Sequence, residues 1–397
     1  MSSAVESHNQ QLDFLGDAVL ELISTHHLFC LLPANDEGVL TDARVGVINN
    51  HSFASFATRL GLHAFAILGE RAPSGMPWRA EPGAYEKLLA DTFQAFFGAI
   101  YLDRGLGPCR NLFAQVLFSR RSELPLRRCW LQVAEQPYEE PDPAERSLDD
   151  PEQTALLQFE SSTSIVFRRF GLLRQAFTHQ SYFTNHPAST VFFPSEREGK
   201  GPHNQRLEFL GDALLKLAST DYLYHQFPEQ QENQLSVLRS SLVNNSLLCD
   251  VAATCGMHHC MRFFQDEALE PGRTRRKMLA DCFEAFLGAL FLDRQPLGMD
   301  FVKVFTDQML FTLTRQTIEE RRWMGKISRL ERICWLRPCA LPRARARAQA
   351  LLTQVEAPLT QVRFLPPPAA ARSKDAPAVL PQRVQLDLGL SATHHAV

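Results

Sequence analysis

The sequence predicts an all-α protein built from two similar domains in tandem. Apolar letters recur with helical period, as in LADCFEAFLGALFL at 279–292, and the alternating β-branched pattern of strands is scarce. The ten letters NQQLDFLGDA at 9–18 return as NQRLEFLGDA at 204–213. A repeat of this length is typical of two homologous domains rather than of a short solenoid unit. We therefore expect the two halves to pair within one chain as an intramolecular pseudo-dimer.

The repeat extends over much of each half. A shift of 195 positions aligns Arg44 with Arg239. After five additional residues in the first copy, a shift of 190 aligns KLLADTFQAFFGAIYLDR at 87–104 with KMLADCFEAFLGALFLDR at 277–294. Each copy is therefore expected to supply the same set of helices.

Changes in composition divide the chain into four parts. The first domain is expected at 1–130, an acidic and Pro-rich linker at 131–154, the second domain at 155–317, and a tail at 318–397. The tail is basic at first and then low in complexity, so it is expected to be disordered.

The start of the first copy differs from that of the second. A helical segment around 155–182 precedes the second repeat, whereas only seven residues precede His8. We expect the first domain to be N-terminally truncated, as in a fragment or in a gene model with a misplaced start.

Composition argues against a secreted or membrane protein. The N-terminus lacks the basic start and following apolar stretch of a secretion signal. No apolar run is expected to be long enough to span a bilayer. The formal net charge of −3 is no global signature of a nucleic-acid binder, although the runs at 273–277 and 315–347 are locally basic.

Pairs of side chains at helical spacing in each copy are the candidate site. Glu208 and Asp212 are four residues apart, and Asp281 and Glu284 are three apart, so each pair shares a helix face. A lone pair of acids on a helix is usually a solvated face. Here the pairs lie among apolar letters and recur in a duplicate, which favours a divalent cation between them. Four oxygen ligands suit Mg²⁺, for which Mn²⁺ can substitute, and such an ion can assist phosphodiester hydrolysis.

The second copy resembles the ribonuclease III signature set. The resemblance rests on FGLLRQAFTHQSY at 170–182, HNQRLEFLGDA at 203–213, LSVLRSSLVNN at 235–245 and LADCFEAFLGALFLD at 279–293. The tandem arrangement resembles the Drosha-like group, class 2 of the family, more than Dicer. This resemblance implies two all-helical ribonuclease III domains, divalent-metal-dependent cleavage of double-stranded RNA, and one half-site for each strand.

Carried over position by position, the resemblance implies an intact catalytic and metal-binding set in the second domain and a degenerate set in the first. The second set is Glu208, Asp212, Asp281 and Glu284, and the first is Asp13, Asp17, Asp91 and Gln94. Gln94 replaces a carboxylate by a neutral amide, which is a weaker ligand. We expect the first half-site to be weak or inactive.

The resemblance also implies substrates, partners and location. We expect cleavage of primary microRNA hairpins in the nucleus, or alternatively in the cytosol, with a double-stranded-RNA-binding protein of the Pasha kind as partner and no membrane. No double-stranded-RNA-binding domain is expected within 318–397. The alternatives are a catalytically impaired RNA-binding or scaffold protein and a Dicer-type ribonuclease.

Overall fold

The computed structural model describes residues 9–67, 83–118, 151–185, 203–263 and 273–312. Within these ranges every regular element is helical, and the β structure consists of one isolated bridge between Thr178 and Arg262. The all-α prediction is confirmed for this part of the chain.

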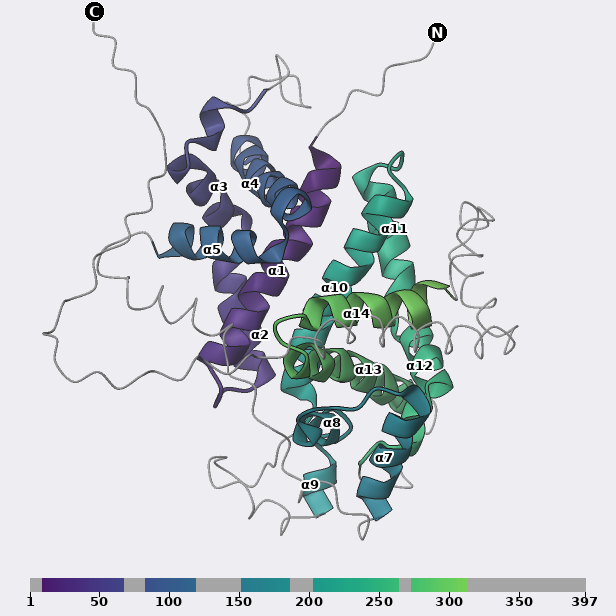
Figure 1. Cartoon of the computed structure of the whole chain (residues 1–397). Helices are drawn as coiled ribbons and strands as arrows, with labels where there is room; N and C mark the ends of the chain where they lie inside the picture. The colour runs from purple at the N-terminus through teal and green to yellow at the C-terminus, as the bar shows by residue number, and fades with distance from the viewer. Residues whose placement is uncertain (1–8, 68–82, 119–150, 186–202, 264–272, 313–397) are drawn as a thin grey trace, which may run out of the picture. The chain divides into compact units, whose positions relative to one another are not determined.

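The helices of the first half are α1 (Gln10–Leu31), α2 (Glu37–Val47), α3 (Asn50–Arg59), the 3-10 turn η1 (Leu62–Ala64), α4 (Ala84–Arg104) and α5 (Leu106–Leu117). Among them, α1 packs against α2, α4 and α5, and α3 packs against α4 (Figure 1).

The second half repeats this order and adds helices at both ends. Its elements are α7 (Pro151–Thr163), α8 (Phe170–Ala176), α9 (Tyr182–Asn185), α10 (Gln205–Gln226), α11 (Glu232–Leu242), α12 (Asn245–Thr254), η7 (Met257–His259), α13 (Arg273–Asp293), α14 (Gly298–Thr306) and the π-helical turn η8 (Asp307–Phe311). The series from α1 to α4 thus matches the series from α10 to α13. The first helix of the second half, α7, begins inside the segment 131–154 that was expected to be a linker. The predicted tail at 318–397 lies outside the described residues.

Equivalent residues start and end equivalent helices. The Asn49 side chain accepts a hydrogen bond from the Ser52 amide at the start of α3, and Asn244 does the same for the Leu247 amide at the start of α12. After these helices, Gly61 and Gly256 adopt φ of 74° and 79°, a left-handed conformation that glycine adopts without strain. The duplication therefore preserves the signals that set helix boundaries.

Two long helices cross closely in each half because glycines stand at the crossing. A Cβ atom at Gly16 would overlap the Gln94 carbonyl oxygen on α4, and one at Gly211 would overlap the Glu284 carbonyl oxygen on α13. Backbone therefore lies directly against backbone at both crossings. This close approach brings side chains on the two helices, one turn from the glycines, toward a common point.

The apolar character of α1 is explained by its packing. By length and hydropathy this helix of 22 residues could cross a membrane, but 67% of its most apolar window is buried inside the protein. It packs against α4 of its own half and against α10 of the other half (Figure 1). Its apolar side chains are core side chains.

The two halves contact each other through equivalent residues. The guanidinium group of Arg44 lies 4.7 Å from the centre of the Phe209 ring, and that of Arg239 lies 4.5 Å from the centre of the Phe14 ring. Such cation–π contacts contribute about 0.5–2 kcal/mol each. Since the shift of 195 positions relates the two pairs, the contacts are arranged as in a symmetric dimer.

Substituting the crossing glycine tests its role. Gly211→Ala should lower the free energy of unfolding by about 1–3 kcal/mol or more, because backbone atoms of α13 leave no space for a methyl group. The matched control is Gly46→Ala in α2, where a Cβ atom meets nothing within 4 Å. It should raise stability by up to about 1 kcal/mol, because alanine has the higher helix propensity. Urea unfolding followed by circular dichroism measures both, and equal effects would contradict the proposed close crossing.

Candidate metal centre

Three of the four acids predicted for the second half converge. Helix α10 supplies Glu208, and α13 supplies Asp281 and Glu284. One carboxylate oxygen of each lies within 4.8 Å of those of the other two. Asp212, the fourth predicted residue, is the exposed member of the set, one turn along α10 from Glu208. Its charge nevertheless acts on Glu284.

The cluster carries uncompensated negative charge. Burial and the neighbouring Asp212, Glu208 and Asp281 carboxylates hold the pKa of Glu284 well above its ordinary value. Burial and then Asp281 raise the pKa of Glu208 to about 7. Partial burial and then the Glu21 carboxylate raise the pKa of Asp212, whereas the Arg44, Lys216 and Arg239 side chains lower it. Like charges forced together in this way are stabilised by a bound cation.

One protein cation already contacts the cluster. The Lys277 ammonium lies 2.6 Å from Asp281 Oδ2, one helical turn away on α13. The Lys277 side chain is 60% exposed, whereas that of Asp281 is 12% exposed. An exposed lysine can turn toward solvent at little cost, so it does not prevent an ion from binding to Asp281.

The donor set fits a hard divalent ion. Carboxylate oxygens from two helices are the ligands that Mg²⁺ and Mn²⁺ prefer, and burial together with the neighbouring carboxylates makes a cation favourable at this cluster. Such an ion can activate water and stabilise charge that develops on a phosphate.

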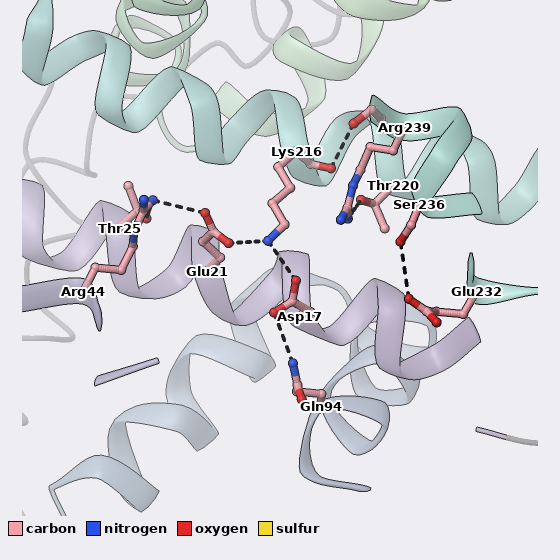
Figure 2. Close-up of polar contacts among 11 residues, drawn as sticks. Asp17, Glu21, Thr25, Arg44, Gln94, Lys216, Thr220, Glu232, Ser236 and Arg239 are labelled. Atoms are coloured by element: carbon pink, nitrogen blue, oxygen red, sulfur yellow. Dashed lines mark hydrogen bonds and ion pairs between the residues drawn. The ribbon is translucent and has the colours of Figure 1, made fainter. Parts of the chain in front are cut away.

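The first half arranges its equivalent residues differently (Figure 2). The Gln94 amide donates a hydrogen bond of 3.1 Å to Asp17 Oδ1, and Lys216 of the second half lies 2.8 Å from Asp17 Oδ2. Burial and then Asp91 raise the pKa of Asp13 to about 8. Among the described residues, the first half shows no cluster of three converging acids.

Sequence reasoning missed three residues that act across the two halves. Glu37, at the start of α2, raises the pKa of Glu208 in the other half, and its Oε2 atom is buried without a hydrogen-bond partner among the described residues. Glu232, at the start of α11, likewise raises the pKa values of Asp13 and Asp91. Lys216, which pairs with Asp17 of the other half, is the third such residue. Glu37 and Glu232 are equivalent in the repeat, and this shared acidic position was the available signal.

Each half matches a family model of the ribonuclease III type. A family described as "Ribonuclease III domain" matches residues 10–105, and one described as "Ribonuclease-III-like" matches residues 170–312. These ranges include all eight positions predicted from the sequence as site residues.

Curated proteins that are similar to this chain carry the name "Ribonuclease 3". Proteins named "Ribonuclease 3" from Mus musculus and Homo sapiens are each 32% identical over 331 residues, which is 83% of this chain and 22% of theirs. A "Ribonuclease 3" from Caenorhabditis elegans is 31% identical over 330 residues, which is 82% of this chain and 28% of that protein. This chain therefore spans about a quarter of the length of these relatives.

The raised pKa values predict how metal binding depends on pH. Glu208, with a pKa of about 7, and Glu284 must lose their protons before they bind an ion, so affinity for Mg²⁺ should increase between pH 6 and pH 8. Without metal, the protonated Glu208 favours the folded state. That contribution is complete below pH 4.5 and is lost as pH rises through about 7.

Thermal unfolding with and without Mg²⁺ at both pH values measures this effect. The ion should raise the midpoint more at pH 8 than at pH 6, and Glu284→Gln should reduce the increase. An equal increase at both pH values would contradict the assignment of these carboxylates as ligands.

Proposed function

The chain belongs to the ribonuclease III family and carries two of its domains in tandem, and from this premise we propose that it is a divalent-metal-dependent endoribonuclease that cleaves double-stranded RNA hairpins. The observation that supports this most is the convergence of Glu208, Asp281 and Glu284. Proteins bind double-stranded RNA mainly through its shape, its phosphates and its 2′-hydroxyl groups. Because these features do not depend on base sequence, the position of the RNA on the protein determines which phosphodiester bond is cleaved.

The second domain is proposed as the working half-site. Glu208, Asp281 and Glu284 would hold the ion, and Asp212 would add negative charge beside them. When bound, the ion supplies an activated water and stabilises charge on the phosphate. The chain's own contribution is to fix the two helices at Gly211, so that the carboxylates converge before metal and RNA arrive.

Within the family, we assign the chain to the Drosha-like group. The similarity to the mouse and human proteins extends over 331 residues and so includes both domains. This supports primary microRNA hairpins as substrates, the nucleus as location, and a Pasha-type double-stranded-RNA-binding protein as partner. A Dicer-type substrate and a cytosolic location are the alternatives.

A second candidate function is a non-catalytic RNA-binding or scaffold protein. The hydrogen bond from Gln94 to Asp17 favours it, because this contact uses an acid of the first half-site for structure rather than for metal binding. The two functions differ in one result. A scaffold would shift a hairpin RNA in a gel in EDTA and would leave it intact after Mg²⁺ is added.

Neutralising one half-buried acid tests the enzyme proposal. Glu284→Gln should lower Mg²⁺-dependent cleavage of a hairpin RNA about a hundredfold or more, which corresponds to a loss of ~2.7 kcal/mol of transition-state stabilisation. The fold should be retained, because the substitution removes like-charge repulsion from the cluster. Helical content and the unfolding midpoint measure retention.

The matched control is Asp250→Asn in α12. It also neutralises one carboxylate of the second domain, but Asp250 pairs with Arg276 at 3.2 Å and is not part of the acid cluster. Cleavage by this variant should stay near the wild-type rate. If Glu284→Gln cleaved as fast as Asp250→Asn, the site assignment would be wrong.

A further inference from the structure

We propose that Lys216 of the second domain is the resident cation of the first half-site: it holds Asp17, the counterpart of Asp212, in an ion pair between the domains, and its positive charge disfavours a divalent ion in the acid set to which Asp17 belongs. This inference rests on the proposed function, because it takes the first acid set as the counterpart of a metal site. It adds that a residue from the other domain, and not only Gln94, inactivates that set.

Both carboxylate oxygens of Asp17 are engaged by protein donors (Figure 2). Oδ2 lies 2.8 Å from the Lys216 ammonium nitrogen, and Oδ1 accepts a hydrogen bond of 3.1 Å from Gln94 Nε2. These are the distances of a charge-assisted contact and of an ordinary hydrogen bond. An ion that bound Asp17 would have to displace at least one of them.

Lys216 is held in this position by a second acid. Its ammonium group also pairs with Glu21, one turn along α1 from Asp17, and Glu21 is in turn 3.1 Å from Arg44. The Lys216 side chain is 22% exposed, in contrast to the 60% of Lys277 at the other cluster. Withdrawing Lys216 would therefore leave poorly solvated carboxylates without their cation, which is costly.

The two half-sites also differ at a repeat position across the domain contact. The shift of 195 positions aligns Lys216 with Glu21. Asp17 therefore pairs with Lys216 of the other domain, whereas the group that acts on Asp212 from the equivalent position is the Glu21 carboxylate. The Lys216, Arg44 and Arg239 side chains also act on Asp212. Asp17 is thus paired with a cation of the other domain, whereas the cluster of Glu208, Asp281 and Glu284 contacts the exposed Lys277 of its own helix.

This arrangement predicts that restoring the missing acid is insufficient. Gln94→Glu returns a carboxylate to the first set, but Lys216 still occupies Asp17. Gln94→Glu combined with Lys216→Met removes the cation and keeps the apolar stem of the side chain. Glu21 retains Arg44 in this double variant, so it is not left unpaired.

The experiment counts Mn²⁺ bound to the chain of residues 1–397 at pH 8, from the free-ion electron paramagnetic resonance signal. Gln94→Glu should bind the same number of ions as wild type, and Gln94→Glu with Lys216→Met should bind one more. The matched control is Gln94→Glu with Lys216→Arg, which keeps a cation and should bind no additional ion. Circular dichroism checks folding, and Lys216→Gln is the second neutral variant if Lys216→Met loses helical content.

Two results would overturn the proposal. An additional ion in Gln94→Glu alone would show that Lys216 does not exclude metal, and no additional ion in the folded double variant would show that something else does. Failure of the proposed function is measured separately by Glu284→Gln. If that variant bound as much Mn²⁺ as wild type, the second half-site would be misassigned, whatever the result at Lys216.

Discussion

The structure depends on like charges held close together where two helices cross at glycine. Gly16 and Gly211 let the helix backbones touch, and carboxylates on the crossing helices are then brought together whether or not a cation is present. Burial of these carboxylates and then repulsion between them cost free energy, and both raise the pKa values of Asp13, Glu208 and Glu284. Each copy of the domain must compensate this cost.

The two copies reach different solutions. In the first half, Lys216 and the Gln94 amide satisfy Asp17, so the compensation comes from protein groups and also links the domains. In the second half, Lys277 is exposed and the acids keep excess negative charge. An acid paired with a cation of the protein, as Asp17 is, favours stability, and a cluster with excess negative charge favours metal binding. A gene duplication allows one chain to combine both, since only one copy must retain the chemistry.

Much of this followed from sequence because spacing and repetition are local properties. Helical period, the repeated LGDA sequence and the acids at three- and four-residue spacing predicted two helical domains. They also predicted that Glu208, Asp212, Asp281 and Glu284 would meet, and the structure brings together all of these except Asp212. The roles of Glu37, Glu232 and Lys216 could not be predicted, because each acts on the half to which it does not belong. Their effect depends on how α1 and α10 pair, which no periodicity encodes.

One half-site is proposed to cleave RNA, and the other has its Asp17 occupied by protein groups. Cleavage of a hairpin RNA labelled separately at its 5′ and 3′ ends, with Mg²⁺ and with EDTA, distinguishes one working half-site from two. We expect metal-dependent cutting of one strand only. Cutting of both strands at similar rates would contradict this expectation, because the first acid set would then bind metal despite Lys216 and Gln94.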